Sequence, residues 1–139
     1  MKALLVPPSD VVSIWQEVEP LIDKALSYAT EEIYASDFLV SILQGTKFLW
    51  IGTEENEIQS VLILEPIKHP RNVSLFIHVW STKSGYEGDD WLSFWEEIEN
   101  FGRINGCDFI EAKARKGLAK KLKTLNWNDT HSYATLTLR

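Results

Sequence analysis

The chain has 139 residues, of which 45% are hydrophobic and 24% are charged, a composition typical of a folded domain rather than of a disordered segment. Its net charge of −6 disfavours a general nucleic-acid-binding protein, because contacts to phosphates need a basic surface. The only cysteine, Cys107, excludes an intramolecular disulfide, and no apolar run approaches the roughly 20 residues of a membrane span. We therefore expect a single domain over residues 1–139 in the cytoplasm, with no nucleic-acid or membrane partner.

The N-terminal part of the chain predicts one strand and one amphipathic helix. Residues 3–6 form a short apolar run, and two prolines end it. Ser9 or Asp10 can cap the helix that follows, in which apolar side chains repeat every three or four residues as far as Ala25. Pro20 falls inside this pattern and should kink or divide the helix.

A second helix and a three-stranded meander should follow. The helix is expected to begin near Thr30 and to end at Gly45. Residues 47–52 and 58–64 then show the pattern of a β-hairpin, with a polar turn between them. Pro66 and the segment His69-Pro70-Arg71-Asn72 should break the pattern before the third strand, residues 73–80.

The predicted second helix, which precedes this meander, has acidic residues near its N-terminus. Glu31 and Glu32 should lie in its first turn, where negative charge is favourable beside the positive end of the helix dipole.

The C-terminal part predicts an aromatic helix followed by a strand, a basic helix and a last strand. Asp89 or Asp90 can cap the aromatic helix, and Gly106 should end it. Its apolar stripe consists of Trp91, Phe94, Trp95, Ile98 and Phe101.

The three remaining elements are residues 109–114 (strand), 117–125 (short cationic helix) and 132–138 (strand). The complete order is therefore β–α–α–β–β–β–α–β–α–β. Because a helix connects residues 73–80 to residues 109–114, these two strands should be parallel. The hairpin before them is antiparallel, so we predict an α/β (mixed α+β) fold with a mixed central sheet and helices on both of its faces.

This order resembles the GCN5-related N-acetyltransferase (GNAT) fold over essentially the whole chain. It resembles more narrowly the small acetyltransferase-like proteins of tailed bacteriophages. The residues that carry the narrower resemblance are Trp91 and Trp95, Gly106-Cys107-Asp108-Phe109-Ile110-Glu111, Arg115-Lys116-Gly117, and Asn126-Trp127.

The resemblance implies a site for acetyl-CoA where the two parallel strands diverge, with the pyrophosphate on the turn that opens the aromatic helix. It implies cofactor contacts from Val79, Ser81, Lys83, Gly85, Gly88, Arg115 and Lys120. Alternatively, Gly85 and Gly88 are ordinary loop glycines, and the basic cluster between Lys113 and Lys123 only solubilises a surface helix or binds an acidic partner.

The resemblance also implies a base on the central strands and an acid for the departing thiolate. Glu65, His78 and Glu111 are the candidate bases, and no pair among them is fixed by spacing. Alternatively, His78 is a hydrogen-bonded side chain on the sheet, and Glu111 belongs to a solvated face. Leu122 occupies the position at which many family members have the tyrosine that protonates the thiolate. Tyr133 and Tyr86 are the nearby tyrosines that could replace it, although neither fits the motif.

Other site chemistries find little support in the sequence. The three histidines and the single cysteine are widely scattered, so no metal site is expected. Cys107 is expected to be a buried small hydrophobic residue, because the sequence places no histidine beside it to activate a thiolate.

Two functions remain open from the sequence. The first is an N-acetyltransferase in which an amine of a small molecule or protein attacks acetyl-CoA directly, with backbone N–H groups at the end of residues 73–80 polarising the carbonyl. The second is a non-catalytic virion component or host-interaction protein that binds a protein partner, in the host cytoplasm or in a virion. It is favoured by six tryptophans and by carboxylates at Glu87, Asp89 and Asp90, where a pyrophosphate would bind. Either could form a homo-oligomer, and an acidic inhibitor of a nucleic-acid enzyme is a weaker third reading.

Overall fold

The computed structural model describes residues 1–27, 32–83, 90–113, 127–128 and 136. The predicted turn around Gly85 and Gly88, the predicted basic helix over residues 117–125 and the predicted strand over residues 132–138 lie outside the described residues.

The described part of the chain forms a five-stranded mixed sheet in which the strands lie side by side in chain order. The strands are β1 (Lys2–Leu5), β2 (Phe48–Glu54), β3 (Glu57–Lys68), β4 (Val73–Thr82) and β5 (Phe109–Ala112). The first four are antiparallel to their neighbours, whereas β4 and β5 are parallel. This confirms the predicted crossover, since a parallel pair needs a connection that returns to the same end of the sheet.

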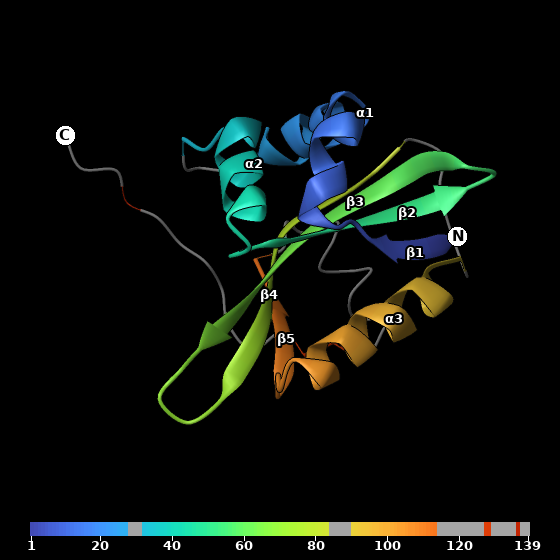
Figure 1. Ribbon diagram of the computed structural model, residues 1–139. Coiled ribbons are helices and arrows are strands. Elements are labelled where there is room, and N and C mark those ends of the chain that lie inside the picture. The colour runs from blue at the N-terminus through green and yellow to red at the C-terminus, as the bar shows by residue number, and fades with distance from the viewer. Residues whose placement is uncertain (28–31, 84–89, 114–126, 129–135, 137–139) are drawn as a thin grey trace.

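Helices cover both faces of the sheet, as predicted. The helices α1 (Pro8–Leu26) and α2 (Ala35–Leu43) lie on one face, and α3 (Asp90–Ile104) lies on the other (Figure 1). Each face has its own apolar cluster. Val18, Ile22 and Ile42 pack on the α1/α2 face, and Phe94 and Ile98 pack on the α3 face.

The helix α1 begins and continues differently from the prediction. Its N-cap is Pro7, and Ser9 and Asp10 lie inside the first turn, so the expected side-chain cap is wrong. Pro8 occupies a position where the missing N–H costs nothing, because the first N–H groups of a helix have no partner inside it. Pro20 does not divide the helix, since the buried Leu21 next to it helps to hold α1 against the sheet.

The helix α2 is shorter than predicted. It begins at Ala35 rather than near Thr30, so Glu32 lies before it and not in its first turn. The acidic residue of its first turn is Asp37, whose Oδ2 accepts a hydrogen bond of 2.8 Å from the backbone N–H of Tyr34. The helix ends before Gly45, which has a φ of +80° and confirms the predicted stop.

The hairpin of β3 and β4 extends beyond the rest of the sheet on one side (Figure 1). Pro66 does not end β3, as it was expected to do, and pairs with Leu75 of β4. The last residue of β3 that pairs with β2 is Leu64, so Pro66 lies where β3 has a free side and can do without a donor. The hairpin closes at the pair Lys68–Val73.

The helix α3 begins at Asp90, so Asp90 belongs to the helix rather than preceding it as a cap. Gly106 follows its end with a φ of +71°, which confirms the predicted stop.

Candidate active site

The centre of the candidate site is an irregularity in β4 at His78. Ile63 of β3 pairs with Val79, and the next residue, Leu64, pairs with Ile77, so His78 has no partner across the hairpin. Such a bulge re-aims the side chains around it. The His78 ring lies 5.9 Å from the ring of Phe38 in α2.

His78 is hydrogen-bonded to a carboxylate of the neighbouring strand. Its Nε2 lies 2.8 Å from Oε1 of Glu65, and both side chains are about a quarter exposed, at 23% and 28%. A carboxylate accepts a hydrogen bond, so Nε2 carries the hydrogen and Nδ1 keeps its lone pair. The structure thus brings together two of the three predicted bases, Glu65 and His78.

The surroundings of His78 keep its imidazole neutral. Burial lowers the pKa of His78 below its ordinary value of 6.5, the contact with Glu65 opposes this shift, and the positive charges of Lys47 and Lys113 add to it. Lys47 is itself an ion-pair partner of the same carboxylate, with its Nζ 3.8 Å from Oε1 of Glu65. The described residues around the ring therefore favour a base that is free of its proton at neutral pH.

The bulge lies where β4 loses its pairing with β5. The last parallel pair is Ile77–Ala112, whereas β4 continues to Thr82. Val79 and Ser81, both predicted cofactor contacts, lie on this continuation. The far end of β4 is tied to α1, because Lys24 Nζ donates a hydrogen bond of 2.9 Å to the carbonyl of Thr82.

Glu111, the third predicted base, is not part of the His78 pair. Its Oε2 lies 3.7 Å from Nε2 of His69, and both side chains are more than a third exposed. The same Nε2 of His69 lies 3.0 Å from Oγ of the buried Ser74. Glu111 thus belongs to a second histidine–carboxylate contact on the same sheet.

Of the remaining predicted site residues, the structure describes only Lys83. Lys83 is exposed, and its backbone N–H donates to the carbonyl of Gln59 over 2.8 Å. The predicted contacts that lie outside the described residues are Gly85, Gly88, Arg115, Lys120 and Tyr133.

Reasoning from the sequence missed four residues that shape this region: Phe38, Lys47, His69 and Phe76. The sequence predicted His69 only as part of a break between strands. The signal for Phe76 was available, since counting back from a turn at residues 69–72 places it opposite Glu65. The position of Lys47 beside Glu65 depends on the packing of two strands and could not be read from spacing.

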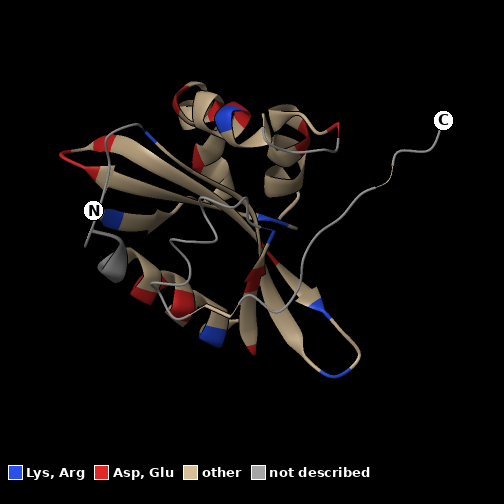
Figure 2. Cartoon of the chain, turned by 180° about the vertical axis from the view of Figure 1, so that it is seen from behind, with Lys and Arg blue, Asp and Glu red and all other residues tan. Residues whose placement is uncertain are grey.

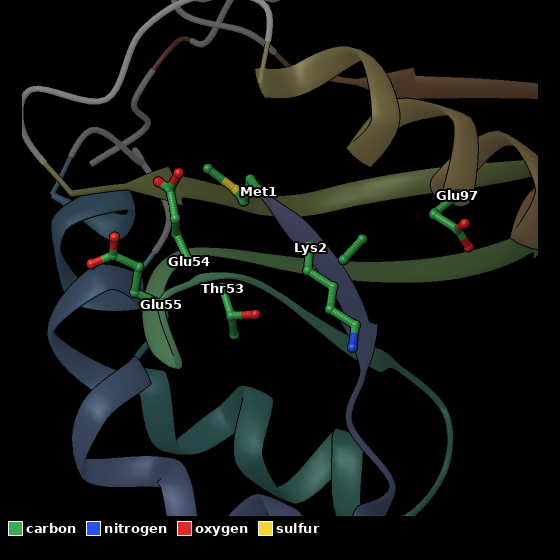
Figure 3. A pocket seen from close by; sticks show the side chains of 7 residues that line it. Met1, Lys2, Thr53, Glu54, Glu55 and Glu97 are labelled. Atoms are coloured by element: carbon green, nitrogen blue, oxygen red, sulfur yellow. The ribbon is translucent and has the colours of Figure 1, made fainter.

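A separate hollow lies at the start of β1, and it does not suit an anionic cofactor. It is lined by Lys2 and Thr53, and also by the carboxylates of Glu54, Glu55 and Glu97 (Figure 3). Carboxylates repel phosphate groups. Seen from behind, acidic residues lie along α3 and at the β2–β3 turn, whereas basic residues lie at the tip of the β3–β4 hairpin (Figure 2).

Two other chemistries find no support in the described residues. No group of three or more His, Cys, Asp or Glu side chains in the described part of the chain could hold a metal ion. Burial and the charge of Asp108 raise the pKa of Cys107, so its thiol stays protonated and is a poor nucleophile.

Of the helices that the structure describes, none has the length and apolar character needed to cross a membrane.

Comparison with known proteins identifies the fold. No protein-family model matches the sequence, and the search of curated proteins found no similar sequence. Among solved structures, the chain is similar to an aminoglycoside acetyltransferase from an uncultured soil metagenomic sample, with a TM-score of 0.74 at 12% identity over 99% of this chain and 98% of the other. It is also similar to a predicted acetyltransferase with acetyl-CoA from Clostridium acetobutylicum, with a TM-score of 0.71 at 14% identity over 98% and 95%.

A third similar structure is the ribosomal-protein-alanine N-acetyltransferase of Brucella melitensis biovar Abortus 2308, with a TM-score of 0.68 at 10% identity over 100% and 99%. At such identities, the likeness shows the fold and leaves the activity open. The chain has the fold of the GCN5-related N-acetyltransferases, which confirms the predicted fold class. The phage connection stays a prediction.

Proposed function

We propose that this protein transfers an acetyl group from acetyl-CoA to an amine, with His78 as the base that takes the amine proton. The observation that carries the proposal is the His78–Glu65 contact of 2.8 Å, set in a bulge of β4 beside the point where pairing with β5 ends. An ionisable pair that is partly exposed at a break in a regular sheet favours a catalytic role over a structural one.

The described residues fit acetyl-CoA along β4. Beyond Ile77 this strand has no paired residue of β5 within the described part of the chain, so we place the ligand along this edge of β4, next to Val79 and Ser81. The exposed Lys83 follows the strand and would offer a cation to a phosphate. Contacts from Gly85, Gly88, Arg115 and Lys120 belong to this proposal as predictions.

Acetyl-CoA, when bound, supplies the thioester carbonyl that the amine nitrogen attacks. In this proposal Nδ1 of His78 accepts the amine proton, while Glu65 holds the tautomer and stabilises the imidazolium that forms. Burial keeps His78 neutral before the reaction, and the positive charges of Lys47 and Lys113 act in the same direction. They also disfavour a protonated amine at this position, and only an unprotonated amine is a nucleophile.

Two measurements test the proposal. Millimolar acetyl-CoA should raise the melting temperature of the wild-type protein, because a ligand that binds only the folded state stabilises it. The variant His78→Gln should keep this thermal shift and lose about 10² to 10⁴-fold in the rate of acetyl transfer, the usual contribution of a general base.

The control is Glu99→Gln, an exposed change on α3, which should leave both the thermal shift and the rate unchanged. Absence of any acetyl-CoA binding to the wild type would refute the proposal. If His78→Gln kept the wild-type rate of acetyl transfer, His78 would not be the base.

The non-catalytic alternative, a virion component or host-interaction protein, needs an exposed aromatic surface. The tryptophan side chains that the structure describes are buried or half-buried, which counts against it. Trp95 packs against both Trp80 and Trp127. Its ring centroid lies 5.0 Å from that of Trp80 and 5.7 Å from that of Trp127.

A further inference from the structure

Two glutamates and a phenylalanine lie in one row across three neighbouring strands. Glu65 of β3 pairs with Phe76 of β4, and Phe76 pairs in turn with Glu111 of β5. Neighbouring strands are about 4.8 Å apart, so the Cα atoms of the two glutamates are separated by roughly 10 Å.

The contacts of these residues place them on the same face of the sheet. Glu65 contacts His78, whose ring centroid lies 4.7 Å from that of Phe76. At the other end, Glu111 contacts His69, which in turn contacts Ser74.

Ser74 is two residues before Phe76 on the same strand, and residues two apart on a strand face the same way. The row therefore begins and ends with a histidine–carboxylate contact, and the half-buried ring of Phe76 lies between them.

The two ends of this row differ in charge. At the His78 end, Lys47 pairs with Glu65 and Lys113 acts on His78, so cations offset the carboxylate. At the other end, Glu111 forms an ion pair with His69, which is charged only when it is protonated, and Lys113 lies two residues farther along the chain. The carboxylate of Glu65 is thus offset directly by Lys47, whereas a neutral His69 leaves the charge of Glu111 available to a bound cation.

We propose that the acceptor is a diamine or polyamine. One nitrogen reacts at His78 in its neutral form, the aliphatic chain crosses the ring of Phe76, and a second, protonated nitrogen binds the carboxylate of Glu111. Aromatic rings bind both methylene groups and cations, so Phe76 suits such a chain. This inference rests on the proposed acetyl transfer.

The test compares amines of matched length. The wild type, with acetyl-CoA, is assayed on putrescine, cadaverine and spermidine, and on butylamine as the monoamine. We expect kcat/KM to be up to about tenfold higher for the best diamine or polyamine than for butylamine, which corresponds to about 1.4 kcal/mol. Glu111→Gln should reduce this ratio towards one, mainly through a higher KM for the diamine.

Two variants make the result specific. Glu111→Asp keeps the charge and should restore part of the preference, which a purely structural role of Glu111 would not predict. Glu57→Gln removes a charge from an exposed residue at the other end of β3 and should leave the ratio unchanged.

Two outcomes would overturn the inference while leaving the acetyl transfer intact: equal rates for butylamine and the diamines, or a preference that Glu111→Gln does not alter. Absence of acetyl transfer to every amine would instead refute the proposed function, and this inference with it.

Discussion

The two faces of β4 differ in how completely they are covered. On the α3 face, Leu75 and Ile77 are buried, and Trp80 packs against Trp95. On the α1/α2 face, Phe76 and His78 are only half-buried. The same strand thus has one face inside the core and one that reaches solvent.

The difference is local to the candidate site, because Val79 farther along β4 is buried in the α1/α2 cluster. The helix α3 has 15 residues and contributes the fully buried Phe94 and Ile98 to its cluster. The helix α2 has only nine residues and reaches the candidate site through Phe38. Both faces contribute buried apolar side chains, and the part of the α1/α2 face around Phe76 and His78 leaves ionisable groups within reach of a substrate.

The largest expected effect on stability concerns Phe94, on the α3 face of the sheet. Phe94→Ala removes a fully buried ring and should lower the free energy of unfolding by about 3 to 5 kcal/mol, because a cavity is left behind. Urea denaturation monitored by circular dichroism measures this change.

The matched change on the other face is Phe76→Ala, which should cost clearly less stability, since the ring is only half-buried. It should instead raise KM for the amine. Equal losses of stability from the two variants would contradict the comparison of the two faces.

Apolar periodicity predicted most of the fold. The stripe containing Phe94 and Ile98 marked α3, and the crossover rule then made β4 and β5 parallel. The sequence-based prediction was wrong at positions where tertiary contacts determine the course of the chain. The packing of Leu21 keeps α1 continuous past Pro20, and a free side of β3 tolerates Pro66.

The candidate site was predicted as separate residues and not as a pair. Glu65 was predicted at the end of its strand, but no register with residues 73–80 was predicted, so Glu65 was not paired with His78. A bulge at His78 follows from the packing of the whole sheet, and no local pattern predicts it.

A smaller effect concerns α2, the short helix above the site. Asp37→Ala removes the hydrogen bond from its carboxylate to the N–H of Tyr34 and should cost about 1 kcal/mol, the usual loss for a helix N-terminal contact. Thermal unfolding measures it, with the exposed Ser36→Ala on the same turn as the control. If Asp37→Ala also lowers the acetyl-transfer rate, the position of α2 over the site is part of the activity.

The smallest expected effect concerns the pH dependence of stability and tests the charge around His78. The pKa of His78 in the folded protein is lower than its ordinary value of 6.5, chiefly through burial. Between these two values the unfolded chain binds more protons, so stability is fully present above about pH 6.5 and falls as the pH drops through the folded pKa. His78→Gln should remove this contribution.

The wild type should thus lose stability relative to His78→Gln between about pH 7.5 and about pH 5, as measured by urea denaturation at each pH. The opposite sign, with the wild type gaining on the variant in acid, would mean that the contact with Glu65 outweighs burial. The pKa of His78 would then be raised and not lowered, which would contradict the charge balance described around the ring, whereas the fold and the position of the bulge would be unaffected.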